Sequence, residues 1–560
     1  MTGQTQLSYS HGTAYHPLLG ETIGANLRRI ARTFPGREAL VDVPSGGRWS
    51  YAELDGDSDI LARGLIAAGL KAGDRVGIWA PNCAEWVLVQ YATAKAGIIL
   101  VNINPAYRSH ELSYVLRQSG VRLLISAEAF KSSDYRGMID EVRNGIEELE
   151  QVIYLGSADW GALLAAGRHL GEAAGEDPGE AADPLAEREA TLSFDDPINI
   201  QYTSGTTGFP KGATLSHHNI LNNGFFIGEG CRYTERDRVC IPVPFYHCFG
   251  MVLGNLACST HGAAIVIPAP GFDPVATLRA VAAEQCTALY GVPTMFIAEF
   301  ALPDFAAYDL SSLRTGIMAG SPCPVEVMKR VVSEMHMAEV TICYGMTETS
   351  PVSAQTRADD DMERRVSTVG RVHPHVEVKV VNPETGLVVP RGETGEMCTR
   401  GYSVMLGYWN DPEQTSGVID DARWMHTGDL AVMDEAGYLN IAGRIKDMII
   451  RGGENVYPRE VEEFLYGHPA IEDVQIIGVP DARYGEELCA WVKLRPGQDL
   501  TEQDLRAYCT GKIAHFKIPR YLRVTGDFPM TVTGKVQKFK MREVSIAELG
   551  LEAAARTETA

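Results

Sequence analysis

One run of eleven residues constrains this chain most: Tyr202-Thr203-Ser204-Gly205-Thr206-Thr207-Gly208-Phe209-Pro210-Lys211-Gly212. It follows residues 198–202, whose apolar pattern predicts a short strand, so the small residues fall in the turn that leaves this strand. From Thr203 to Gly212 there are four hydroxyl side chains, three glycines and one lysine. Glycine lets backbone N–H groups approach a ligand, hydroxyls donate further hydrogen bonds, and lysine adds a positive charge. The run therefore predicts a loop that binds polyphosphate.

The spacing of this loop differs from the Walker form, which places four residues between its first glycine and Gly-Lys-Ser/Thr. Here Gly205, Gly208 and Lys211 recur every three residues. A shorter run of Gly and Thr would be equally consistent with an ordinary surface loop. Eleven residues in this order favour the phosphate loop.

Length and composition indicate a multidomain soluble enzyme. With 560 residues the chain exceeds what one hydrophobic core usually serves, so we expect at least two domains. No apolar run approaches the roughly 20 residues that span a bilayer, and the first residues lack the pattern of a secretory signal. Eleven cysteines without a Cys-x-x-Cys pair indicate reduced thiols, so we expect a cytoplasmic protein.

The net charge of −22 argues against nucleic acid as a partner. One segment differs: between Arg506 and Arg542 there are nine Lys or Arg residues and a single acid, Asp527. This local excess is consistent with a solvated lysine-rich face. It is also consistent with a surface that meets polyanions such as ATP or CoA, and both interpretations stay open.

The order of sequence patterns predicts an α/β fold. Residues 75–80 are typical of a buried strand, residues 85–96 of a helix, and residues 98–102 of the next strand. This order predicts a large N-terminal domain of parallel or mixed sheets covered by helices. Residues 165–189 are rich in Ala, Gly and acids, and we expect an exposed excursion there without assigning it a function.

A second, smaller domain is predicted from about Lys446 onward. Pro458 opens a helix that carries Val461, Phe464 and Leu465 on one face, and residues 474–479 and 488–494 are typical of strands. We therefore divide the chain into residues 1–445 and 446–560. About 115 residues are enough for a domain that folds alone.

The phosphate loop resembles the signature of the adenylate-forming superfamily, which contains acyl-CoA synthetases, firefly luciferase and the adenylation domains of peptide synthetases. Further segments resemble that superfamily's motifs in the same order along the chain: Pro244-Phe245-Tyr246-His247-Cys248-Phe249-Gly250, Tyr344-Gly345-Met346-Thr347-Glu348, Thr427-Gly428-Asp429, Gly443-Arg444-Ile445-Lys446-Asp447 and Pro529-Met530-Thr531-Val532-Thr533-Gly534-Lys535. The resemblance covers about residues 25–545. It implies an N-terminal AMP-binding domain and a mobile α+β C-terminal domain that carries a catalytic lysine.

The resemblance implies a two-step reaction with ATP, Mg²⁺ and CoA. A carboxylate attacks the α-phosphorus of ATP, pyrophosphate leaves, and the resulting acyl-AMP then reacts with a thiol. Because both reactants of the first step are anions, the protein must offset their repulsion and align the reacting groups.

The nucleotide site implied by the resemblance combines several segments. Its ATP- and AMP-binding residues are Thr203, Ser204, Gly205, Thr206, Thr207, Gly208, Lys211, Gly320, Ser321, Pro322, Cys343, Tyr344, Gly345, Met346, Thr347, Asp429, Arg444 and Lys535. Lys211 would hold the β- and γ-phosphates, and Tyr344 would lie against the adenine. Asp429 would accept hydrogen bonds from the ribose hydroxyls, with Arg444 as a second contact. Glu348 would ligate Mg²⁺ directly or through water, since hard oxygen ligands suit this ion.

The implied catalytic residues are Lys535, Thr347, Glu348 and His247. Several of these motifs are ordinary when taken alone: Thr347-Glu348 is consistent with a helix start, and Thr-Gly-Asp or an exposed turn lysine is common. Their shared order along the chain favours the catalytic interpretation. His247 would position the acyl carboxylate, which needs no proton removed at neutral pH.

Three further roles follow from the resemblance. Phe245, Tyr246, His247 and Gly250 would line the acyl pocket. Lys446 would be the hinge of the C-terminal domain, and Gly452 and Gly453 would line the path of the CoA thiol.

We therefore predict an AMP-forming acid–thiol ligase that joins a fatty acid to CoA. Segments 400–409 and 535–540 are most similar to medium-chain acyl-CoA ligases. An aryl-CoA ligase stays open, and so does a ligase that charges a carrier protein in trans, because the 25 residues after Lys535 hold no carrier. A non-catalytic adenylate-binding sensor is the alternative from another class. A homodimer is left open.

Overall fold

A computed structural model describes residues 6–174, 182–203, 210–321, 323–452, 454–481, 483–530 and 536–552. The chain forms two compact units. The larger comprises Ser10–Val378 and Thr399–His426, and the smaller comprises Met1–Tyr9, Lys379–Cys398 and Thr427–Ala560. The division predicted at residue 445 stays a prediction.

A seven-stranded sheet carries the phosphate-loop segment. In spatial order its strands are β21 (Gly407–Tyr408), β11 (Lys211–Ser216), β10 (Pro197–Thr203), β5 (Ile99–Asn102), β4 (Arg75–Trp79), β6 (Leu123–Ser126) and β9 (Gln151–Tyr154). The last five run parallel, whereas β11 is antiparallel to both of its neighbours. Thr203 at the end of β10 pairs with Lys211 at the start of β11. The loop therefore joins two adjacent antiparallel strands, and the predicted strand before it is confirmed.

A nine-stranded sheet forms the second layer of the larger unit. Its strands, in order, are β18 (Arg371–Val372), β17 (Val352–Gln355), β16 (Glu339–Gly345), β15 (Thr315–Ala319), β14 (Ala288–Gly291), β12 (Arg238–Cys240), β13 (Ala264–Ile267), β2 (Glu38–Asp42) and β3 (Gly47–Ser50). The six strands from β16 to β2 are parallel. Carboxyl ends of parallel strands meet at one edge of a sheet, so the turns after β15 and β16 lie side by side.

The main core lies between these two sheets. One buried cluster contains Ile78 of β4, Tyr91 of α3 (Ala84–Ala96) and Ile317 of β15. Every residue of α3 except Glu85 is buried, and the buried charge of Lys95 is paired with Asp55 and Asp59 of α2. The core is completed by α2 (Tyr51–Ala67), α8 (His217–Gly230) and the π-helix η2 (Phe249–Leu256). The predicted α/β class is confirmed.

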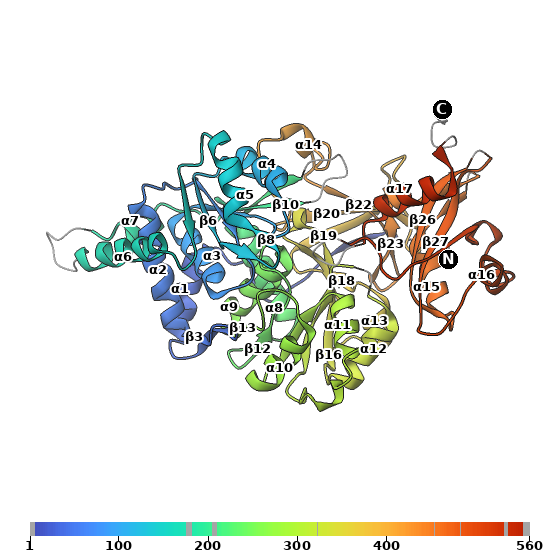
Figure 1. Ribbon diagram of the computed structural model, residues 1–560, viewed down its shortest axis with the longest axis horizontal. Helices are drawn as coiled ribbons and strands as arrows, with labels where there is room; N and C mark the ends of the chain where they lie inside the picture. Colours follow the sequence, from blue (N-terminus) through green and yellow to red (C-terminus); the bar gives the residue numbers. More distant parts are fainter. Residues whose placement is uncertain are drawn as a thin grey trace. The chain divides into compact units, whose positions relative to one another are not determined.

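Other helices cover the outer faces of the sheets. Residues of α4 (Ser109–Ser119) and α5 (Tyr135–Val142) pack on β5 and β6, while α10 (Pro274–Glu284), α11 (Pro293–Phe300), α12 (Val325–Glu334) and α13 (Met362–Ser367) gather on β12 to β16 (Figure 1). The remaining elements of this unit are α1 (Ile23–Thr33), β7 (Ala129–Phe130), β8 (Ser133–Asp134), η1 (Arg143–Gly145), α6 (Ala158–Ala173), α7 (Pro184–Glu189), α9 (Ala257–His261), η3 (Phe305–Ala307), η4 (Thr347–Thr349) and α14 (Pro412–Ser416).

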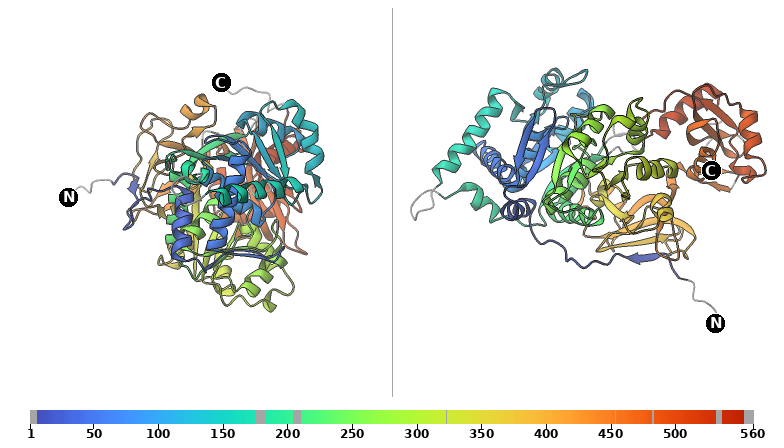
Figure 2. Two further views of the ribbon diagram at one scale, coloured as in Figure 1. Left: turned by 90° about the vertical axis from the view of Figure 1, so that its left-hand side faces the viewer. Right: turned by 90° about the horizontal axis from the view of Figure 1, so that it is seen from below.

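The acidic segment expected as an exposed excursion forms helices whose residues, within the described part, are mostly exposed or half-buried. Helix α6 packs along α2, as Figure 2 shows at the edge of the larger unit, and α7 follows. Two ion pairs fasten α7 and its cap: Arg63 to Asp183 at 2.7 Å and Arg28 to Glu189 at 2.9 Å. Residues 175–181 lie outside the described part.

A five-stranded sheet is built from β1 (Tyr9–His11), β19 (Val376–Val381), β20 (Thr394–Gly401), β22 (Met425–Met433) and β23 (Leu439–Arg444). The C-terminal sheet contains β25 (Glu454–Val456), β24 (Ile449–Arg451), β27 (Gly485–Leu494) and β26 (Ile471–Asp481), with β28 (Tyr521–Val524) parallel to β27. Its helices are η5 (Ile445–Asp447), α15 (Pro458–Tyr466), α16 (Glu502–Cys509), η6 (His515–Lys517) and α17 (Lys538–Leu549).

The helix and the two strands predicted for the C-terminal part are confirmed. A helix begins at Pro458 and buries Val461 and Leu465, and both predicted strands lie within β26 and β27. Within the described ranges, no helix is both long and apolar enough to cross a membrane.

Most of the basic segment is paired with acids of the same unit. Its ion pairs are Lys517–Glu460, Arg520–Asp481, Arg523–Glu548, Lys538–Glu462 and Arg542–Glu486. Paired side chains hold little free charge for a polyanion, so the pairing favours the structural interpretation of this segment.

Candidate active site

The strands on both sides of the phosphate loop place Thr203 and Lys211 directly opposite each other. The predicted residues Ser204, Gly205, Thr206, Thr207 and Gly208 lie outside the described part. The Lys211 ammonium lies over the ring of Tyr408, 5.1 Å from its centroid. Lys211 also lines a cavity of about 250 Å³, together with Tyr114, Gln118, Pro210, Gly212, Tyr408, Trp409, Asp411 and Gln414.

The predicted magnesium residue occupies a short turn after β16. Thr347 and Glu348 lie in η4, and the Glu348 side chain is buried, with 6% of the residue exposed. The hydroxyl of Tyr408 donates a hydrogen bond to Oε1 of Glu348 at 2.8 Å. The backbone N–H of Met405 donates to the carbonyl of Glu348 at 2.9 Å. The segment 405–408 therefore holds both the backbone and the side chain of Glu348.

Lys211 and Glu348 thus meet at the same side chain, Tyr408, which the sequence reasoning missed. Strand β21 pairs with β11, so that Tyr408 lies opposite Ala213, two residues after Lys211. Burial and the neighbouring Glu348 carboxylate raise the pKa of Tyr408, so the phenol keeps its proton at neutral pH. The only sequence signal was the resemblance of segment 400–409 to fatty acyl-CoA synthetases, which assigned no role to a single residue.

The two segments predicted to flank the adenine are neighbours at the edge of the nine-stranded sheet. Cys343 of β16 pairs with Ala319 of β15, which brings Tyr344 beside Gly320 and Ser321. Cys343 is buried and Met346 is half-buried, whereas Pro322 lies outside the described part. A Cβ atom on Gly345 would lie only 1.6 Å from the carbonyl oxygen of Pro351, so this position requires glycine.

The segment predicted to line the acyl pocket divides into a core residue and more accessible ones. Phe245 is fully buried against Trp86, with 5.6 Å between ring centroids, so its contacts belong to the core. Tyr246 and His247 are half-buried, and Nδ1 of His247 accepts a hydrogen bond from the backbone N–H of Phe249 at 3.2 Å. A Cβ atom on Gly250 would lie 2.4 Å from the carbonyl oxygen of Pro244.

A buried hydrogen bond ties this segment to the phosphate-loop strand. The Cys248 thiol donates to Oε1 of Gln201 at 3.0 Å, and Gln201 lies on β10 two residues before Thr203. Residues 244–250 and the strand that enters the loop are therefore held together directly.

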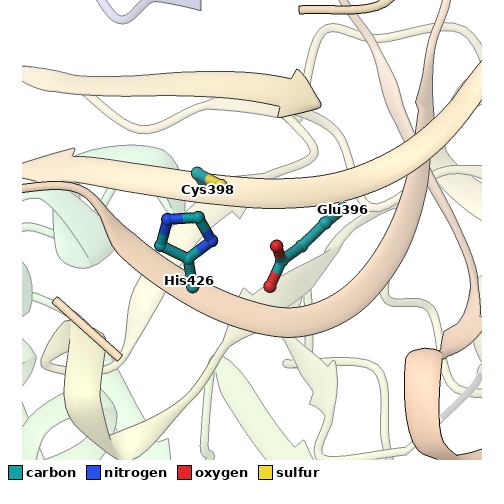
Figure 3. Close-up of side chains that lie close together, drawn as sticks. All are labelled: Glu396, Cys398 and His426. Carbon is teal, nitrogen blue, oxygen red and sulfur yellow. The ribbon is translucent and has the colours of Figure 1, made fainter. Parts of the chain in front are cut away.

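In the smaller unit, the predicted ribose residues form a cross-strand pair. Asp429 on β22 lies opposite Arg444 on β23, and Nε of Arg444 is 3.0 Å from Oδ1 of Asp429. Gly428 adopts a positive φ of 69°, and its N–H donates to Glu396 at 3.1 Å. Figure 3 shows Glu396 on β20, with Cys398 on the same strand and His426 on β22. The chain from Asp429 to Arg444 therefore forms a β-hairpin.

The hinge and thiol-path predictions fall on turns of the smaller unit. Lys446 lies in η5 with an exposed side chain. Gly452 follows β24 with φ of 62°, and its N–H donates to the carbonyl of Tyr484 at 2.8 Å. Gly453 lies outside the described part.

Lys535 also lies outside the described part, and the structure describes the residues on either side of 531–535. Met530 and Val536 form an antiparallel bridge. Lys538 donates to Oε1 of Glu462 at 2.6 Å and to the carbonyl of Ile476 at 3.1 Å. Because these contacts already occupy Lys538, it serves to anchor the end of the segment.

Two models of known protein families match most of the chain. The model of the AMP-binding enzyme family matches residues 27–409, and that of the AMP-binding enzyme C-terminal domain matches residues 460–535. The Bacillus subtilis (strain 168) relative YngI, whose name describes an acyl-CoA synthetase, is 50% identical over 95% of this chain and 99% of its own length. The mitochondrial medium-chain acyl-CoA ligase of Danio rerio is 47% identical over 97% of this chain and 91% of its own.

Solved structures show the same architecture. The anthranilate CoA ligase AuaEII, in complex with anthranoyl-AMP, has a TM-score of 0.84 and 27% identity over 96% of this chain and 99% of that chain. ATP-bound MatB from Rhodopseudomonas palustris has a TM-score of 0.81 and 30% identity over 93% of this chain and 99% of that chain.

Proposed function

Because the chain belongs to the family of AMP-binding enzymes, we propose that it is an ATP-dependent acyl-CoA ligase that acts on medium-chain fatty acids in the cytoplasm. The carboxylate reacts with ATP to give acyl-AMP and pyrophosphate, and CoA then gives acyl-CoA and AMP. The observation that carries this proposal is the meeting of Lys211 and Glu348 at Tyr408, beside the strands that hold the phosphate loop.

The residues of this site fit a magnesium ion. Glu348 and Thr347 offer hard oxygen donors, and the Glu348 carboxylate is buried with the Tyr408 hydroxyl as its partner. A buried carboxylate is costly unless positive charge or hydrogen bonds offset it. When bound, Mg²⁺ would neutralise phosphate charge.

The remaining residues receive the following roles. Tyr344, Gly320 and Ser321 bind the adenine, and Asp429 and Arg444 bind the ribose. His247 positions the acyl carboxylate, since a fatty acid at neutral pH is already ionised. Lys535 contacts the reacting carboxylate and the α-phosphate. Lys446 absorbs the rotation of the C-terminal domain, after which Gly452 and Gly453 line the thiol path.

A substrate panel tests the proposed specificity. AMP release that depends on CoA is measured with short-, medium- and long-chain fatty acids and with aromatic acids, and medium-chain acids are expected to give the highest kcat/KM. A preference for aromatic acids would instead identify an aryl-CoA ligase. Turnover with a carrier protein but not with CoA would identify the carrier-charging alternative.

Asp429→Asn tests the ribose site. We expect the variant to lose about 10- to 100-fold in kcat/KM for ATP, because a neutral amide binds the ribose hydroxyls less strongly and leaves Arg444 unpaired. The measurement compares ATP with 2′,3′-dideoxy-ATP, which lacks those hydroxyls and should lose little. Glu435→Gln, an exposed change in the turn between the same strands, is the control. Equal losses for both nucleotides would contradict a ribose contact.

A further inference from the structure

Tyr408 lies between two groups of opposite charge that the proposed reaction uses separately. The Lys211 ammonium lies over its ring, 5.1 Å from the centroid, and its hydroxyl donates to Glu348 at 2.8 Å. Among the residues that the structure describes, no ion pair joins Lys211 to Glu348. The aromatic ring is therefore a shared contact of both.

We propose that Tyr408 is a positioning residue that orients Glu348 for the divalent ion and keeps Lys211 from pairing with it. The inference deepens the proposed function and rests on it. A direct Lys211–Glu348 pair would neutralise both groups, leaving less negative charge for the metal and less positive charge for the phosphates. The ring face attracts the ammonium, and the hydroxyl satisfies one carboxylate oxygen, so Tyr408 gives each group a partner without cancelling either charge.

The backbone around Tyr408 fixes the ring in this place. Strand β21 pairs with β11, and the N–H of Trp409 donates to the carbonyl of Gly212 at 2.7 Å. The N–H of Tyr408 itself donates to Oγ1 of Thr415 at 2.9 Å, and only 8% of Tyr408 is exposed. The backbone contacts fix the position from which the side chain extends, and the burial of the ring together with its hydrogen bond to Glu348 restricts its rotation.

Two substitutions separate the tasks of the hydroxyl and the ring. Tyr408→Phe keeps the ring and removes the donor, whereas Tyr408→Leu removes both. Tyr402→Phe is the matched control, since Tyr402 is a tyrosine of the same segment whose hydroxyl contacts Asn223 at 3.4 Å. Thermal unfolding of each variant verifies that it folds.

The decisive readout is ATP binding by isothermal titration calorimetry, with Mg²⁺ or with EDTA, in the absence of any carboxylic acid. For Tyr408→Phe we expect the ratio of the ATP affinity with Mg²⁺ to the ATP affinity in EDTA to fall about tenfold. The ATP affinity in EDTA itself should stay unchanged. For Tyr408→Leu we expect affinity to fall in EDTA as well, because Lys211 becomes free to pair with Glu348. Tyr402→Phe should match the unsubstituted chain in both conditions.

Several results would overturn the inference. These are an unchanged Mg²⁺ effect in Tyr408→Phe, an equal change in Tyr402→Phe, or an unsubstituted chain whose ATP affinity ignores Mg²⁺. Failure of the proposed function is a separate observation: normal Mg²⁺-dependent ATP binding without turnover of any acid would reject the ligase and leave the role of Tyr408 supported.

Discussion

Lys535→Ala is expected to form acyl-AMP about 100- to 1000-fold more slowly, yet to make acyl-CoA from supplied acyl-AMP at a nearly normal rate. The lysine charge is needed only while the carboxylate attacks the α-phosphate, because acyl-AMP already contains the activated bond. Two assays separate the steps: pyrophosphate exchange into ATP for the first, and thioester formation from synthetic acyl-AMP and CoA for the second.

Neighbouring lysines provide the comparison for this prediction. Lys540→Ala should keep both steps, since among the described residues this ammonium has only a distant contact with the Phe539 ring, at 5.9 Å. Lys538→Ala should instead lower the melting temperature, because the buried Glu462 loses its positively charged partner and keeps the hydrogen bond from the Ile476 N–H. Equal loss of both half-reactions in Lys535→Ala would refute the assignment of Lys535 to adenylation.

Glu348→Gln is expected to slow acyl-AMP formation about 100-fold at saturating Mg²⁺. The amide oxygen can still accept the hydrogen bond from Tyr408, so the fold and the turn should persist while the metal loses an anionic ligand. The measurement is pyrophosphate exchange as a function of Mg²⁺ concentration, with thermal unfolding as the check on folding. Glu413→Gln, an exposed acid on α14 near the same segment, is the control. An unaltered Mg²⁺ profile in Glu348→Gln would exclude Glu348 as a metal ligand.

Local sequence patterns predicted those parts of the molecule that depend on neighbouring residues. The strand before the phosphate loop and the helix from Pro458 are each set by residues that are close together in the chain. They depend on apolar periodicity and on proline at a helix start.

Contacts between segments that are distant in the chain could not be predicted from local sequence patterns. Tyr408 meets Lys211 only because β21 adds to the edge of β11, almost 200 residues away in the chain, and nothing local specifies that pairing. Phe245 belongs to a motif but packs in the core against Trp86. The alanine-rich segment forms part of α6, a helix for which no prediction was made although alanine is the strongest helix former.

Activation of a carboxylate as its adenylate requires no CoA. With Mg²⁺, a medium-chain fatty acid and no CoA, labelled pyrophosphate should exchange into ATP, and omission of the acid should abolish that exchange. A chain that ATP protects against thermal unfolding but that exchanges no pyrophosphate with any acid would be a nucleotide sensor, and that result would contradict adenylate formation by this protein.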